Sequence, residues 1–129
     1  MKEIERLIKA AKQAVKFAYA PYSKFKVGAA VLTKQGKIFS GVNVENASYG
    51  LTVCAERVAL VKAVSEGEKN FTTIAIYTNT KSFTFPCGAC LQVMVELNPK
   101  LYVILINGKG EIKQFPLSSL LPYSFNPVR

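Results

Sequence analysis

Val53-Cys54-Ala55-Glu56-Arg57 and Pro86-Cys87-Gly88-Ala89-Cys90 contain all three cysteines of this chain of 129 residues. In the first segment, a carboxylic acid follows two residues after the cysteine. In the second, the two cysteines are three residues apart, a spacing that places them on one face of a helix. The three thiols meet only if the fold brings these distant segments together.

Each segment stands at the start of an expected helix. Residues 54–67 have apolar residues at helical spacing, and Gly67 stands where a helix stops. Pro86 is expected to open a second helix over residues 86–97, because its missing N–H costs nothing there. The N–H groups and dipole of a helix start lower the pKa of a thiol. Two such starts converging on one point would suit three thiolates.

The remaining elements are arranged around these two helices. Gly28, Ala29 and Ala30 are small, so we expect another element to approach the backbone closely there. The order of strands and helices predicts one domain over residues 1–129, a three-layer α/β/α fold with a mixed five-stranded sheet. The expected elements are a helix over 3–18, a hairpin of strands 25–33 and 38–44, strands 72–78, 101–106 and 111–115, a helical turn at 117–121 and a tail from 122.

The composition is that of a folded globular protein: half of the residues are apolar and 19% are charged. No apolar run approaches the ~20 residues that span a bilayer, and the start of the chain lacks the apolar region of a signal peptide. We therefore expect a cytoplasmic protein without a membrane partner. The net charge of +9 comes from scattered lysines, which favours a solvated surface over a nucleic-acid interface.

Cysteine and histidine usage restricts the chemistry. An odd cysteine count excludes a fully paired disulfide framework, and the absence of histidine excludes Ser-His and Cys-His catalysis. Cys54, Cys87 and Cys90 could bind one Zn²⁺ and leave the fourth tetrahedral position open, as in catalytic sites. Glu56 would then transfer protons beside the metal, and Arg57 would offset the excess negative charge of three thiolates.

Each of these residues has a simpler interpretation. Glu56 could be an exposed acid in the first turn of a helix, and Arg57 a surface arginine. The cysteines could be inert and buried or form a redox pair, although a redox pair does not explain Cys54. Asn43 and Glu45 follow a strand, where they could hold a polar ligand or only form a turn. Three cysteines with a nearby glutamate and Pro-Cys-x-x-Cys are nevertheless the signature of nucleobase deaminases.

The chain resembles the homotetrameric, all-cysteine class of cytidine deaminase over nearly its whole length. This resemblance implies hydrolytic deamination of cytidine and 2′-deoxycytidine to uridine and 2′-deoxyuridine, with one zinc ion per subunit and sites shared between subunits. The matching segments are Tyr19–Phe25, Val27–Ala30, Asn43–Ala47, Cys54–Arg57, Lys62–Gly67, Pro86–Cys90 and Leu120–Pro122.

The resemblance also implies roles for single residues. Cys54, Cys87 and Cys90 would be the zinc ligands, and Glu56 the proton shuttle. The remaining assignments concern the substrate: Asn43 and Glu45 would bind the ribose, Phe25 would pack against the pyrimidine, backbone groups of Ala55 would read the base, Tyr49 would lie near a subunit contact, and Phe125 would reach a neighbouring subunit's site.

Three departures from the family pattern concern subunit contacts and the surroundings of the zinc. Leu91 stands where relatives often carry arginine, Val42 replaces a common cysteine, and the tail after Phe125 is short. Three alternative functions remain: a different free-base or nucleoside deaminase, a polynucleotide deaminase, and a zinc-binding module without activity. Asn43 and Glu45 together favour a substrate that contains ribose, and Glu56 argues against a module without activity.

Overall fold

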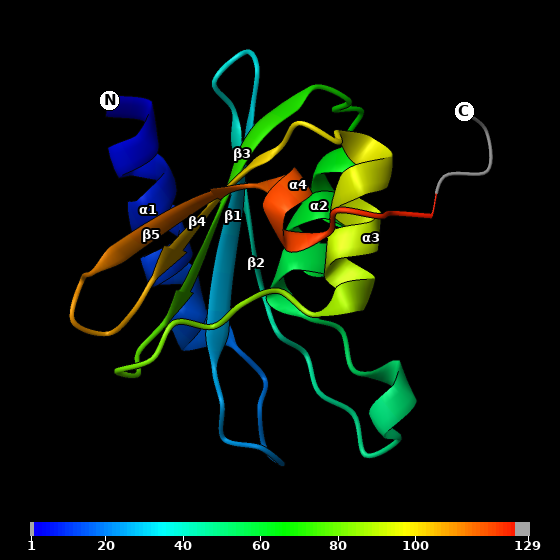
Figure 1. Cartoon of the computed structure of the whole chain (residues 1–129). Helices are drawn as coiled ribbons and strands as arrows, with labels where there is room; N and C mark the ends of the chain where they lie inside the picture. Colours follow the sequence, from blue (N-terminus) through cyan, green and yellow to red (C-terminus); the bar gives the residue numbers. More distant parts are fainter. Residues whose placement is uncertain (1, 126–129) are drawn as a thin grey trace.

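A five-stranded sheet forms the centre of the computed structural model, which describes residues 2–125 (Figure 1). Its strand order is β2-β1-β3-β4-β5, with β3 and β4 parallel and every other neighbouring pair antiparallel. The predicted mixed five-stranded sheet is therefore confirmed. The strands are β1 (Val27–Thr33), β2 (Ile38–Val42), β3 (Phe71–Thr78), β4 (Tyr102–Ile106) and β5 (Ile112–Pro116).

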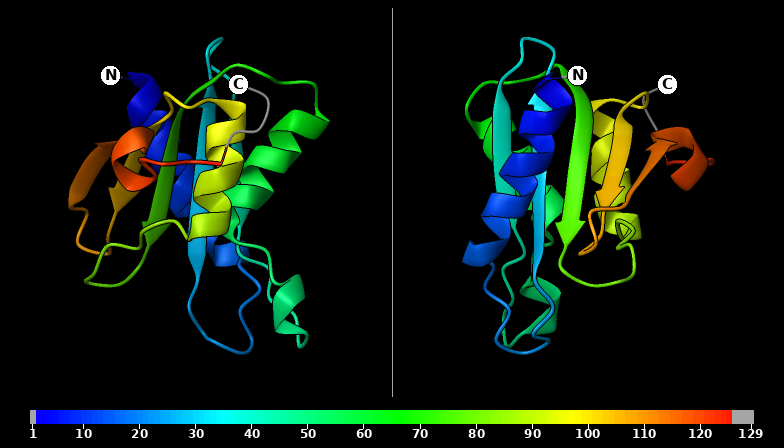
Figure 2. Two further views of the ribbon diagram at one scale, coloured as in Figure 1. Left: turned by 45° about the vertical axis from the view of Figure 1, so that its right-hand side comes forward. Right: turned by 90° about the vertical axis from the view of Figure 1, so that its left-hand side faces the viewer.

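Helices cover both faces of the sheet, which gives the three layers visible in Figure 2. Helix α1 (Lys2–Ala14) covers one face, and α2 (Ala55–Ser65) and α3 (Gly88–Leu97) cover the other, where the short α4 (Leu117–Leu120) contacts α3. Two one-turn 3-10 helices, η1 (Val15–Phe17) and η2 (Tyr49–Leu51), lie in the connections. No helix among residues 2–125 is long and apolar enough to cross a membrane.

Element boundaries differ from the sequence-based expectations by a few residues. Helix α1 ends at Ala14 rather than residue 18, and the chain continues as the 3-10 turn η1 to Phe17 before Tyr19 pairs with Val44. Pro86 does not open α3; Cys87 is the N-cap and Gly88 the first helical residue. The expected end of α2 is confirmed by Gly67, which has φ +94° just after the cap. Residues 126–129 of the expected tail lie outside the described part.

Apolar cores fill both spaces between the sheet and its helices. On the α1 side, Leu7 and Ala11 pack against alternate strand residues such as Ala30 and Ile104. The other core lies under α2 and α3. The expected close approach at Gly28 is confirmed, since a Cβ there would clash with the carbonyl oxygen of Ala11.

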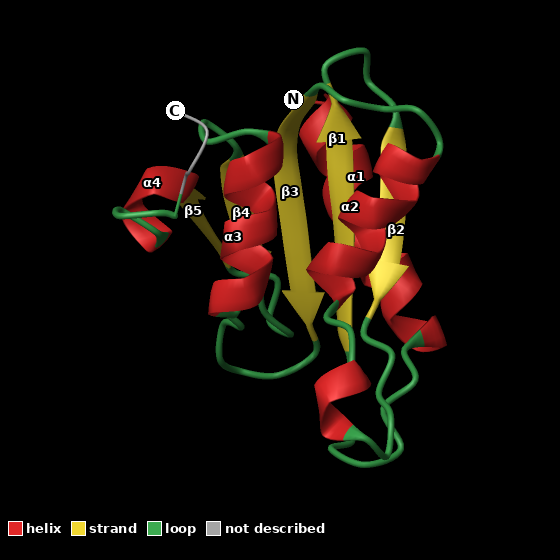
Figure 3. Cartoon of the chain, turned by 90° about the vertical axis from the view of Figure 1, so that its right-hand side faces the viewer, coloured by secondary structure: helices red, strands yellow, loops and turns green. Residues whose placement is uncertain are grey.

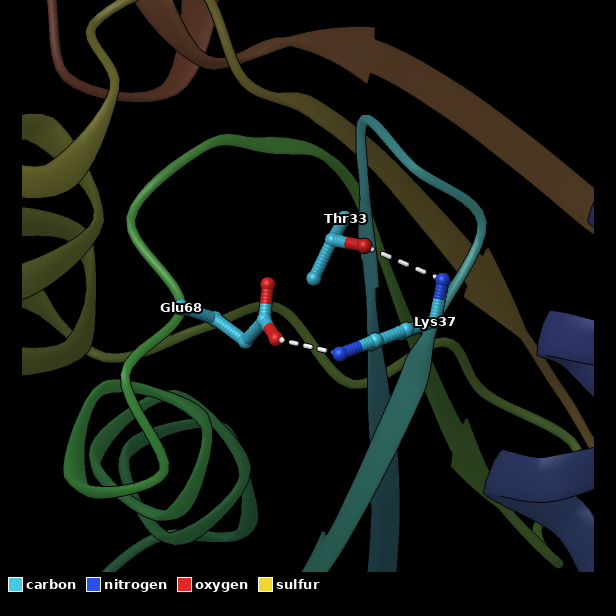
Figure 4. A network of polar contacts seen from close by, with 3 residues as sticks. All are labelled: Thr33, Lys37 and Glu68. Carbon is cyan, nitrogen blue, oxygen red and sulfur yellow. Dashed lines mark hydrogen bonds and ion pairs between the residues drawn. The ribbon is translucent and has the colours of Figure 1, made fainter.

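One end of the molecule is held by polar contacts between the β1–β2 turn and the loop after α2 (Figure 4). The Lys37 backbone N–H donates to Thr33 Oγ1 at 3.0 Å, and Lys37 Nζ lies 3.1 Å from Glu68 Oε2. An ion pair this exposed contributes little stability. In Figure 1 both α2 and α3 begin at the opposite end, where their N-termini lie near one another.

Candidate functional site

Helices α2 and α3 begin side by side on the same face of the sheet (Figure 3). The three cysteines meet at these two helix starts. Cys54 is the N-cap of α2, Cys87 is the N-cap of α3, and Cys90 is the third residue of α3. Their Sγ atoms all lie within 4.8 Å of one another, with 3.7 Å between Cys54 and Cys87 and 3.4 Å between Cys87 and Cys90. The fold therefore brings together thiols that are 33 residues apart in sequence.

The thiol geometry fits a zinc ion. Zn–S bonds of about 2.3 Å at tetrahedral angles place two sulfur atoms about 3.8 Å apart, close to the distances in this cluster. The pKa of Cys54 is lowered to about 5, first by its hydrogen bond with the Cys90 thiol and also by Arg57, against the effect of burial. The pKa of Cys90 is raised, first by that same bond and then by burial. Metal binding must therefore displace a proton from Cys90.

Arg57 is the cation beside the thiols. Its Nη2 donates to Cys54 Sγ at 3.8 Å, and this contact with a thiolate is the first reason why the pKa of Arg57 is raised. Its Nε is buried and has no partner among the described residues. Leu91, at the position where relatives often carry arginine, is only 8% exposed and packs in the core under α2 and α3. It adds no charge to the cluster.

Glu56 is the second residue of α2 and is only 4% exposed. Burial raises the pKa of this carboxyl to about 7, and the charge of Cys54 adds to the shift. Helical spacing would turn Cys54 and Glu56 apart, but Cys54 has extended backbone angles (φ −73°, ψ 154°) because it is the cap. A buried acid with a pKa near neutrality beside the Cys54 thiolate is suited to proton transfer.

The predicted sugar-binding side chains are held by the backbone of the segment before β1. Asn43 accepts a hydrogen bond from the Val27 N–H at 2.9 Å and donates to the Phe25 carbonyl at 2.7 Å. Glu45 accepts from the N–H groups of Tyr22 and Ser23 at 3.0 and 3.1 Å, and also from the Ser23 hydroxyl. These bonds lower the pKa of Glu45, the Ser23 hydroxyl contributing most. Glu45 is therefore an ionised acceptor.

Three further predicted residues lie in different environments. Ala55 is buried as the first residue of α2. Tyr49 is 78% exposed in η2 and lines a cavity of about 360 Å³ together with Glu45 and Ser23. Phe125 is 72% exposed and is not among the residues lining that cavity.

Sequence reasoning missed Ser23 and Gln92. Ser23 holds Glu45, and Gln92 Nε2 donates to the Phe125 carbonyl at 2.8 Å. The only signal for Ser23 was its position inside the matching segment Tyr19–Phe25. No signal pointed to Gln92, because its contact joins α3 to a segment 33 residues later.

Comparison with known proteins gives consistent results. The family model of the cytidine and deoxycytidylate deaminase zinc-binding region matches residues 1–106. A cytidine deaminase from Halalkalibacterium halodurans is 53% identical over 122 residues, which cover 94% of this chain and 92% of that protein. Another, from Sporosarcina psychrophila, is 46% identical over 125 residues, covering 96% and 92%. The crystal structure of cytidine deaminase from Burkholderia pseudomallei superposes with a TM-score of 0.90 at 52% identity, covering 94% of this chain and 98% of that one.

Proposed function

Because the chain belongs to the cytidine and deoxycytidylate deaminase family, we propose that it catalyses the hydrolytic deamination of cytidine and 2′-deoxycytidine. The products are uridine or 2′-deoxyuridine and ammonia. The observation that carries this proposal is the cluster of three thiols within 4.8 Å beside the buried Glu56. Cys54, Cys87 and Cys90 would hold a zinc ion, which would supply a Lewis acid that lowers the pKa of a water molecule.

Glu56 carries the protons in this proposal. Its carboxylate accepts one proton from the attacking water and delivers it to the ring nitrogen of the pyrimidine. It then accepts the second proton, from the hydroxyl that has added to the ring carbon, and passes it to the amino group, which leaves as ammonia. A pKa of about 7 suits both directions of transfer near neutral pH. Arg57 stabilises the Cys54 thiolate by donating to it.

The remaining residues hold the nucleoside. Glu45 accepts a hydrogen bond from a sugar hydroxyl, and Asn43 fixes the backbone on which Phe25 stands. Phe25 packs its ring against the pyrimidine, and the backbone of Ala55 at the start of α2 contacts the base.

We also propose that the chain forms a homotetramer with sites shared between subunits. Val61 and Val64 on α2 are exposed, and with Val93 and Leu97 on α3 they line a cavity of about 350 Å³. Exposed apolar patches are typical of protein interfaces, which supports a subunit contact on this face. Tyr49 and Phe125, both exposed in the single chain, would complete a neighbour's site. Sedimentation equilibrium gives the subunit number, and a monomer would contradict the proposal.

The proposal includes one domain over residues 1–129 and a cytoplasmic location. Thiols that serve as metal ligands must stay reduced, and the cytosol keeps them so. The three cysteines are unpaired in the structure. Fractionation of cells that express a tagged chain would test the location.

The decisive experiment combines metal analysis with the absorbance change on adding cytidine, 2′-deoxycytidine, cytosine or single-stranded DNA. We expect one zinc per chain and turnover of the two nucleosides. Glu56→Gln should keep the zinc and lower kcat by about 10²- to 10⁴-fold or more, the usual contribution of a positioned acid or base.

Glu66→Gln is the matched control, because Glu66 is an exposed cap residue of the same helix. It should leave kcat unchanged. The function is rejected if the protein holds no zinc, or if it deaminates DNA but not nucleosides. Near-normal turnover by Glu56→Gln would reject the role of that residue.

A further inference from the structure

The segment of residues 22–25, which precedes β1, is fastened to Glu45 at three points. The N–H groups of Tyr22 and Ser23 donate to Oε1 at 3.0 and 3.1 Å. The Ser23 hydroxyl donates to Oε2 and accepts from the Phe25 N–H at 3.0 Å. One serine hydroxyl therefore connects the carboxylate to the backbone of the aromatic residue two positions later.

The segment that makes these bonds also contains an unusual backbone conformation. Lys24 has φ +62°, the only positive φ of a non-glycine residue among residues 2–125. Such a conformation costs free energy and persists only where surrounding contacts require it. It lets the Ser23 side chain face Glu45 while the Phe25 carbonyl faces the Asn43 amide.

The two carboxylate oxygens of Glu45 differ in how many hydrogen bonds they can still accept. Each carboxylate oxygen offers about two lone-pair directions. Oε1 takes two backbone N–H groups and is fully used. Oε2 takes only the Ser23 hydroxyl and keeps one direction for another donor. Glu45 and Ser23 both line a cavity of about 360 Å³.

We propose that Ser23 is a positioning residue that directs the free lone pair of Glu45 Oε2 toward a sugar hydroxyl and so favours nucleosides over substrates without that hydroxyl. This inference rests on the proposed function. The backbone donors hold only Oε1, so without Ser23 the other oxygen is free to turn about that anchor. A hydroxyl donor would then meet an acceptor without a fixed direction, and binding would weaken because the ordering must be done by the substrate.

The test compares Ser23→Ala on two substrates, cytidine and 2′,3′-dideoxycytidine, which lacks both ring hydroxyls but keeps the base. We expect kcat/KM for cytidine to fall by about 10- to 100-fold, the size of one lost charge-assisted hydrogen bond, mainly through KM. The value for dideoxycytidine should change by less than about threefold. Ser23→Thr keeps the hydroxyl and should restore cytidine turnover.

Ser48→Ala is the matched control: Ser48 is exposed, directly precedes the cavity-lining Tyr49 in sequence, and its side chain makes no cap hydrogen bond. It should leave both substrates unaffected. Equal losses on both substrates would make Ser23 merely structural and overturn the inference, as would no loss on cytidine.

Turnover of cytidine by the unaltered protein is measured first. If the unaltered protein does not deaminate cytidine, the proposed function is rejected rather than the role of Ser23. Calorimetric binding of the two nucleosides to Ser23→Ala and the unaltered protein then gives the same comparison without turnover. If the difference in affinity between the two nucleosides were the same for Ser23→Ala as for the unaltered protein, the inference would be overturned.

Discussion

Glu56 and Glu45 are the same side chain in opposite environments. Glu56 is buried in the first turn of α2, and burial raises its pKa to about 7. Glu45 follows β2 at the protein surface, and hydrogen bonds from Ser23 and Tyr22 lower its pKa. One acid is therefore ready to exchange protons near neutral pH, while the other stays ionised and only accepts. The chemistry of each carboxyl follows from its surroundings rather than from its residue type.

The two glutamates belong to two differently built regions. The zinc end consists of Cys54, Glu56, Cys87 and Cys90, which stand at helix starts packed on the sheet. The sugar end consists of Ser23, Asn43 and Glu45 with the segment of residues 22–25, and backbone N–H groups hold its side chains. Apolar packing decides the geometry of the first region, and hydrogen bonds decide that of the second.

Replacing Cys90 should break the zinc end completely. Cys90 is the buried thiol of the cluster, and two remaining thiols do not make a structural or catalytic zinc site. We expect Cys90→Ala to lose the bound zinc and all measurable turnover, while circular dichroism still shows the fold. Metal analysis and the cytidine assay measure both. Full zinc content would show that the ion binds elsewhere.

Burial of Glu56 should be visible in the stability of the protein after zinc is removed by a chelator. Its pKa rises from 4.5 to about 7 on folding, so the folded state binds more protons than the unfolded state between these values. Stability therefore falls as pH rises through this window. Glu56→Gln removes the effect and should gain up to about 3 kcal/mol in unfolding free energy over the unaltered protein between pH 4 and pH 8.

Urea denaturation of both zinc-free proteins across that range measures the difference. Glu45→Gln is the comparison from the sugar end, where the pKa shift has the opposite sign. It should lose stability relative to the unaltered protein as pH rises. Parallel pH profiles for all three proteins would contradict the contrast between the two acids.

Gly41→Ala tests whether sheet packing positions the zinc end. A Cβ at Gly41 would lie 2.5 Å from the Ala59 nitrogen and 2.8 Å from the Ala55 carbonyl oxygen, so α2 must move away from β2. We expect a loss of about 1–3 kcal/mol in unfolding free energy and lower turnover, since Glu56 moves with the helix. Gly50→Ala is the control, because a Cβ there meets nothing within 4 Å. Equal melting temperatures for both variants would contradict the prediction.

Lys24→Val tests the backbone conformation at the sugar end, and its expected effect is the smallest of these predictions. A β-branched residue tolerates φ +62° poorly, so this variant should lose about 1 kcal/mol or somewhat more and raise KM for cytidine. Lys24→Asn, which tolerates the conformation, removes the same charge and should be nearly neutral. If both variants raise KM equally, the lysine charge matters rather than the backbone.

The sequence predicted the elements of the fold well and their ends less well. Helical apolar spacing identified the main helices, and largely apolar runs between turn residues identified all five strands, because burial imposes these patterns locally. The ends depend on contacts from elsewhere. The helix expected to residue 18 changes to the 3-10 turn η1 after Ala14, and Tyr19 then pairs with Val44. Cys87 caps α3 in place of the Pro86 start that local propensity favoured.

Some features of the candidate site also follow from the sequence alone, and others only from the tertiary structure. The sequence by itself determined the number of thiols, the absence of histidine and the acid beside Cys54, because these depend only on composition and local spacing. The tertiary structure decided that the thiols converge, that Glu56 is buried and that Ser23 holds Glu45 from 22 residues away. Spacing determines which groups a helix start carries. Only the packing of distant segments determines how far water is excluded from these ionisable groups and which hydrogen-bond donors reach them. Water exclusion and hydrogen bonding together set the charge of each group.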